Sequence, residues 1–113
     1  MDVSGKVVLI TGAARGIGQE FVRSLAAAGA QIVAADLNDC SATLALAAAQ
    51  GGKAIGVTLD VGDAQSALAM TNTAIQAFGR VDALINNAAL YGALRGGRFD
   101  TLAEADWDAA MAV

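Results

Sequence analysis

The chain has 113 residues, enough for one domain, and its 56% hydrophobic content excludes a disordered tail. Its net charge of -4, from 7 basic and 11 acidic side chains, argues against nucleic acid as a partner, because phosphate binding requires a clustered basic face. Histidine is absent and Cys40 is the single cysteine. A Ser-His-Asp triad, a histidine metal site and an internal disulfide are therefore excluded within this chain.

The first residues lack the basic region and long apolar stretch of a signal peptide. The longest apolar runs are far shorter than the roughly 18 residues of a membrane span. We therefore expect a cytoplasmic location and no membrane partner.

The predicted elements begin with residues 7–10, a continuous apolar run typical of a strand buried on both faces. A glycine-rich turn over residues 12–18 follows. Gly29 then ends a helix, because glycine adopts the left-handed cap conformation at little cost. Apolar residues at helical spacing predict the buried face of this helix, and they are Ile17, Phe21, Leu25 and Ala28.

Two further strands are predicted at residues 31–35, ending at Asp36, and at residues 53–59, ending at Asp60. Between them lies an alanine-rich helix over residues 41–50. Asp63 is a predicted N-cap for a helix that Gly79 ends. The predicted buried stripe of that helix consists of Ala64, Leu68, Thr71, Ile75 and Phe78.

A fourth strand is predicted at residues 81–85, before Asn86 and Asn87. A last helix is predicted to begin near Thr101 or Leu102, and Glu104 and Asp106 suit its first turn, where the helix dipole favours anions. Four strands alternating with helices over short links predict a parallel sheet with right-handed crossovers. In such sheets ligands bind beyond the carboxyl ends of the strands.

The glycine turn after the first predicted strand suits a phosphate ligand. Gly12 permits the tight turn, while Gly16 and Gly18 allow the backbone to approach a pyrophosphate and the helix to pack closely. The N–H groups at the helix start would hold the phosphates. The alternative is a tight strand-to-helix turn without a ligand.

Asp36 predicts the cofactor, because a carboxylate at this strand end accepts hydrogen bonds from ribose hydroxyls and repels a 2′-phosphate. Arg15 has the opposite effect, since a guanidinium beside the turn can reach a 2′-phosphate, and Leu37 adds no second basic group. We weigh Asp36 above Arg15 and expect NAD rather than NADP. The alternative for Asp36 is a turn or capping acid.

The two remaining strand ends leave alternatives open. Asp60 could accept from the adenine amino group and Val61 could pack on the ring, or Asp60 could be a turn residue. The amides of Asn86 and Asn87 could tie neighbouring strand ends together or contact a ribose.

Four motifs in this order resemble the short-chain dehydrogenase/reductase family. They are the glycine pattern of Gly12, Gly16 and Gly18 after Thr11, the acid at Asp36, the pair Asp60-Val61, and Asn86-Asn87-Ala88-Ala89, where the family has Asn-Asn-Ala-Gly. The stretch Asp106-Trp107-Asp108 is similar to the start of a family helix. The resemblance runs from Val3 to Val113.

The resemblance implies an α/β, doubly wound Rossmann fold and hydride transfer between a nicotinamide cofactor and an alcohol or carbonyl substrate. Its expected cofactor-binding residues are Gly12, Ala14, Arg15, Gly16, Ile17, Gly18, Asp36, Leu37, Asp60, Val61, Asn87, Ala88 and Ala89.

The family's catalytic residues are an Asn, a Ser, and a Tyr followed four residues later by a Lys, the tyrosine acting as general acid/base. None can be placed in this sequence, and the resemblance would put the Asn directly after Val113. Tyr91 is followed by Arg95 at the right spacing, but arginine does not replace the tunable lysine. We interpret this pair as lining a loop or facing solvent.

We expect residues 1–113 to be a partial NAD(P)-binding Rossmann domain, the first half of an enzyme about twice this length. The half alone is expected to be inactive, and the resemblance implies a homo-oligomer when complete, with a small alcohol or ketone substrate. Two other hypotheses stay open: a non-catalytic dinucleotide-binding module, and a structural domain without a ligand.

Overall fold

The computed structural model describes residues 2–90, 97–101 and 103–113. Within these ranges, four parallel strands form one sheet in the order β3-β2-β1-β4. The strands are β1 (Val7–Thr11), β2 (Gln31–Asp36), β3 (Lys53–Thr58) and β4 (Ala83–Ile85). The helical elements are α1 (Gly16–Ala27), α2 (Ser41–Ala49), α3 (Ala64–Phe78), the short 3-10 helix η1 (Phe99–Thr101) and α4 (Glu104–Met111).

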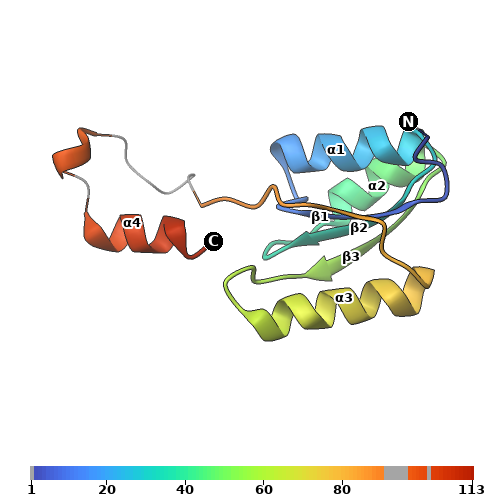
Figure 1. Cartoon of the computed structure of the whole chain (residues 1–113). Helices are drawn as coiled ribbons and strands as arrows, with labels where there is room; N and C mark the ends of the chain where they lie inside the picture. The colour runs from blue at the N-terminus through green and yellow to red at the C-terminus, as the bar shows by residue number, and fades with distance from the viewer. Residues whose placement is uncertain (1, 91–96, 102) are drawn as a thin grey trace.

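Helices cover both faces of the sheet, α1 and α2 on one side and α3 on the other (Figure 1). Alternate residues of β1 therefore enter different cores. Val8 and Ile10 pack with Val22 of α1, whereas Val7 and Leu9 belong to the cluster around α3. This double coverage explains why β1 is a continuous apolar run rather than an alternating one. The predicted parallel α/β sheet is confirmed.

The sequence assigned the buried face of α1 wrongly. Ile17 and Phe21 are 69% and 38% exposed, while the buried residues are Gly18, Val22 and Ala26. Small residues decide the orientation here, because they allow the helix backbone to approach the sheet and the adjoining turn. The other two predicted positions differ from each other, since Leu25 is partly buried against the core and Ala28 is exposed.

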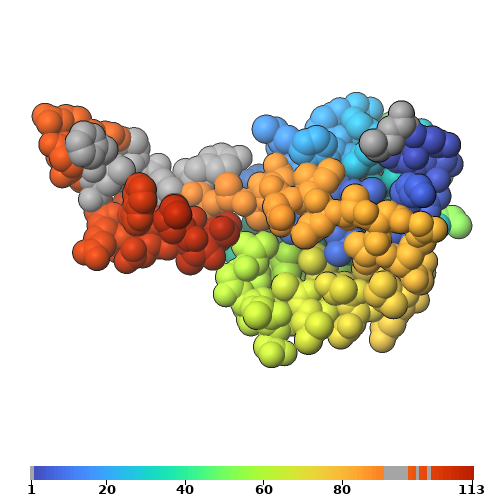
Figure 2. Space-filling view, viewed as in Figure 1, coloured from blue at the N-terminus to red at the C-terminus, as the bar shows by residue number. Residues whose placement is uncertain are grey.

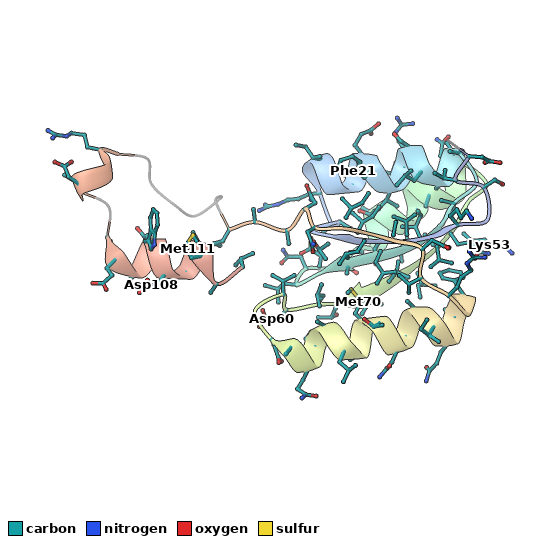
Figure 3. All side chains as sticks on the ribbon, viewed as in Figure 1. Phe21, Lys53, Asp60, Met70, Asp108 and Met111 are labelled. Carbon is teal, nitrogen blue, oxygen red and sulfur yellow. The ribbon has the colours of Figure 1, made fainter. Side chains whose placement is uncertain are left out.

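The predicted stripe on α3 was also wrong, except at its last residue. Leu68 and Ile75 are 55% and 45% exposed, and the buried residues are Met70 and Ala74. Met70 lies between α3 and the sheet in Figure 3. Phe78 is partly buried against the same cluster, so the contact face is rotated from the one that the largest side chains indicated.

The C-terminal helix α4 extends away from the sheet, and only its C-terminal end meets the rest of the molecule (Figure 2), where Val113 lines the cavity at the strand ends. The helix begins at Glu104, later than the predicted start near Thr101 or Leu102, and Glu104 and Asp106 occupy its first turn as predicted. Its large apolar side chains, Trp107 and Met111, are exposed. No helix in the described ranges is both long enough and apolar enough to cross a membrane.

Asp63 caps α3, as predicted: its side chain accepts a hydrogen bond from the Gln65 N–H at 2.9 Å. We expect Asp63→Ala to lower the free energy of unfolding by about 1 kcal/mol, because a first-turn N–H loses its acceptor. Urea denaturation measures the difference. Asp63→Asn retains a cap oxygen and should remain close to wild type; an equal loss in both variants would contradict the capping role.

Candidate functional site

A cavity of about 290 Å³ opens at the carboxyl ends of all four strands. It receives residues from the β1–α1 turn and from the segments that follow β2, β3 and β4, and Asp60 marks the end of β3 in Figure 3. All the predicted cofactor-binding residues line it except Ala14, Gly16 and Gly18. The lining residues that sequence reasoning missed are Ala35, Asn38, Leu59, Leu90 and Val113.

Each glycine of the β1–α1 turn meets a different physical requirement. Gly12 has φ +66, and a Cβ there would lie 2.9 Å from the Ala88 Cα. Gly18 lies so close to the turn that a Cβ would lie 2.1 Å from the Gly12 carbonyl oxygen. Gly16 has φ +60 but open space around it. The turn therefore needs glycine for close approach at Gly12 and Gly18, and for backbone conformation at Gly12 and Gly16.

The helix that follows this turn starts without a side-chain cap. Its N-cap residue, Arg15, is extended (φ -157, ψ 173) and provides no cap hydrogen bond. The first N–H groups of a helix have no intrahelical partner, so the N-terminus of α1 presents free donors and a positive dipole end beside the cavity. The exposed Arg15 forms no salt bridge with any side chain in the described ranges.

Asp36 does more than line the cavity. One carboxylate oxygen, Oδ2, accepts from the Ala14 N–H at 2.9 Å, which links the end of β2 to the glycine turn. The other, Oδ1, accepts from the backbone N–H of Asn38 at 2.9 Å and from its side-chain amide at 3.3 Å. Sequence reasoning missed the bond to Ala14, because nothing in the residue spacing shows how the two strand ends face each other.

Two residues that the sequence did not single out donate hydrogen bonds to the carbonyls of the glycine turn. Thr43 of α2 donates its hydroxyl to the Ala13 carbonyl at 2.8 Å. Gln19 of α1 donates its side-chain amide to the Ala14 carbonyl at 3.3 Å and to the Thr43 hydroxyl at 3.1 Å.

At the end of β4, Asn87 has the structural role that the sequence left open. Its side-chain amide donates to the carbonyls of Thr11 and Gly12, both at 3.2 Å. The N–H groups of Asn87 and Ala88 both donate to the Thr11 hydroxyl at 3.0 Å. The two central strand ends are thereby joined. Thr11 is 3% exposed. Its role as the acceptor of these two hydrogen bonds is visible only once β1 and β4 are paired.

At the end of β3, Asp60 forms a local turn while it lines the cavity. Its Oδ1 accepts from the Gly62 N–H at 2.9 Å, and the side chain is exposed. Val61 is partly buried against the α3 cluster and also lines the cavity. Tyr91 and Arg95, the pair at catalytic spacing, lie outside the described residues.

A family model described as short chain dehydrogenase matches residues 6–113. The chain belongs to the short-chain dehydrogenase family.

A curated relative, an uncharacterized oxidoreductase of Mycobacterium tuberculosis, is 50% identical over 92 residues, which are 80% of this chain and 37% of the relative. A solved short-chain dehydrogenase/reductase from Burkholderia phymatum, in complex with NAD, has a TM-score of 0.89 at 33% identity and covers 100% of this chain and 40% of its own. A metagenomic short-chain oxidoreductase in complex with NADP has a TM-score of 0.86 at 34% identity, and the match covers 100% of this chain and 51% of the metagenomic one. The chain spans about two fifths of the length of the curated relatives it matches.

The close packing of Gly18 against the glycine turn can be tested by adding a methyl group at this position. We expect Gly18→Ala to lower the free energy of unfolding by about 3 kcal/mol or to prevent folding, because the new methyl group overlaps a backbone carbonyl that cannot move aside. Thermal and urea denaturation measure it. Gly97→Ala is the matched control, since its Cβ would lie 3.6 Å from the Thr101 hydroxyl. A Gly18→Ala variant as stable as the control would refute this packing.

Cys40 should be unreactive. It is 6% exposed, and burial, helped by the nearby Asp36 and Asp39 carboxylates, raises the pKa of its thiol from 9.0 to about 11. At about pH 8 the thiolate is then about a hundredfold rarer than in the unfolded chain. Iodoacetamide should alkylate the native protein correspondingly more slowly than the protein in urea.

The raised pKa of the Cys40 thiol also predicts that the folded protein loses stability at high pH. Well below pH 9 the thiol is protonated in both states and adds no pH dependence to stability. As pH rises through 9.0 toward about 11, the thiol ionises in the unfolded chain first, so the free energy of unfolding falls. Equal alkylation rates in native and unfolded protein would contradict the assignment.

Proposed function

We propose that this chain binds the adenosine and pyrophosphate part of a nicotinamide cofactor, with NAD preferred to NADP, within an oxidoreductase that acts on a small alcohol or carbonyl substrate. One observation carries the proposal. The glycine turn, the uncapped N-terminus of α1 and the Asp36 carboxylate meet at one cavity at the strand ends.

The residues present fit such a cofactor. The backbone can approach a pyrophosphate closely where a Cβ at Gly16 would meet only open space, and the α1 N-terminus supplies donors and a favourable dipole. Asp60 and Val61 line the same cavity on the β3 side, where an adenine would find an acceptor and an apolar contact. When bound, a nicotinamide cofactor supplies the redox chemistry; these residues bind and orient its adenosine end.

The carboxylate of Asp36 supports the preference for NAD. A carboxylate has about four acceptor positions, and the described contacts occupy three of them, one from Ala14 and two from Asn38. A ribose hydroxyl can take the fourth, and a second can replace the exposed Asn38 amide. A 2′-phosphate at about 4 Å would be repelled by about 4 kcal/mol at an effective dielectric near 20. Arg15, also at the cavity, reduces that repulsion.

The test measures NAD and NADP affinity by calorimetry in three variants. Asp36→Asn keeps an oxygen for the Ala14 N–H and removes the charge, so we expect NADP affinity to rise by at least about tenfold and NAD affinity to fall only slightly. Asp36→Ala also removes the partner of Ala14 and should weaken NAD more than NADP. Asp39→Asn is the matched control, because Asp39 is exposed and, among the described residues, accepts only from Ser41.

Two results would overturn the proposal. If the wild-type protein binds neither NAD nor NADP, the proposed cofactor site is wrong. If the ratio of NAD to NADP affinity is the same in Asp36→Asn as in the wild type, Asp36 does not determine the preference between the two cofactors.

A further inference from the structure

Ala13 and Ala14, in the middle of the glycine turn, have all four backbone polar groups bonded to other elements. The Ala13 N–H donates to the Ala35 carbonyl at 3.1 Å, and the Ala14 N–H donates to the Asp36 carboxylate at 2.9 Å. Both partners belong to β2. The two carbonyls point to the opposite side of the turn, where Thr43 and Gln19 donate to them.

Thr43 and Gln19 form one connected unit, which we call the carbonyl brace. Thr43 is 0% exposed and lies on α2, remote in sequence from the turn. Gln19 donates to the Thr43 hydroxyl at 3.1 Å, and that hydroxyl donates onward to Ala13 at 2.8 Å. Neither residue lines the cavity, so neither is placed to contact a ligand there.

The brace controls the direction of the next N–H group. A peptide unit is planar and trans, so its carbonyl and its N–H point in opposite directions. The Ala14 carbonyl shares its peptide unit with the Arg15 N–H. When the Gln19 amide holds that carbonyl, the Arg15 N–H points away from the brace, and Arg15 is a cavity-lining residue. Thr43 fixes the preceding peptide in the same way and directs the Ala14 N–H toward Asp36.

We propose that Thr43 and Gln19 are positioning residues for pyrophosphate binding: they orient the peptides of the glycine turn through its carbonyls without touching the ligand. This inference rests on the proposed function, since it concerns the phosphate part of the same site. Free donors have to be oriented before a phosphate arrives, because otherwise part of the binding free energy is lost in ordering the loop.

The experiment compares two probes that differ in the pyrophosphate. ADP-ribose carries it and adenosine does not, while both have the adenosine that Asp36 and Asp60 would hold. Thr43→Val keeps the shape of the side chain and removes the hydroxyl; Thr43→Ser keeps the hydroxyl. Gln19→Met removes the amide at a partly exposed position, so it should fold even where Thr43→Val does not. Thr73→Val is the control, because its hydroxyl donates to Ala69 within the exposed face of α3.

We expect Thr43→Val and Gln19→Met to weaken ADP-ribose binding by about tenfold, about the contribution of one hydrogen bond. Adenosine binding should stay within about twofold of wild type, and Thr43→Ser should restore ADP-ribose binding. Calorimetric titration measures the first probe, and chemical-shift titration measures the weaker second.

The outcomes separate the two proposals. Wild-type protein that binds no ADP-ribose overturns the proposed function. Wild-type binding that the brace variants leave unchanged overturns the brace alone. An equal loss for both probes, or a loss that Thr43→Ser does not restore, means that Thr43 and Gln19 act only on overall stability, and this also overturns the brace.

Discussion

The close approach of the β1–α1 turn to its neighbours is the constraint on which the rest of the structure depends. Gly18 lies against the Gly12 carbonyl and the Asn87 amide, at distances that leave no room for a Cβ. This contact places the start of α1 directly over the ends of β1 and β4. The uncapped helix N-terminus therefore faces the strand ends, where the cavity lies.

Polar groups at the strand ends are bonded to one another before any ligand arrives. Asp36 holds the turn through Ala14, and Asn87 holds β1 to β4 through Thr11. Substituting such residues changes the scaffold and the site together. Thr43 and Gln19 differ, because they bond to the turn carbonyls and do not line the cavity.

Several large apolar side chains are exposed in the described part of the chain, on β4 and on α3. Leu84 pairs with Leu9 in register and faces the same way, yet it is 51% exposed, because α3 packs on β2 and β3. Leu68 and Ile75 of α3 are exposed on this side of the sheet as well.

The sequence by itself determined the order of strands and helices, the parallel sheet, the glycine turn and the Asp63 cap. These depend on local signals: apolar runs, glycine at helix ends, and a capping carboxylate. Apolar spacing failed for the faces of α1 and α3, because large side chains such as Ile17 and Leu68 dominate the pattern while the contact is made by Gly18 and Ala74. Only the tertiary structure decided that Asp36 meets Ala14 and that Thr43 meets Ala13. Those contacts join residues far apart in the chain, and their geometry exists only once the strands are in register and both helices have packed.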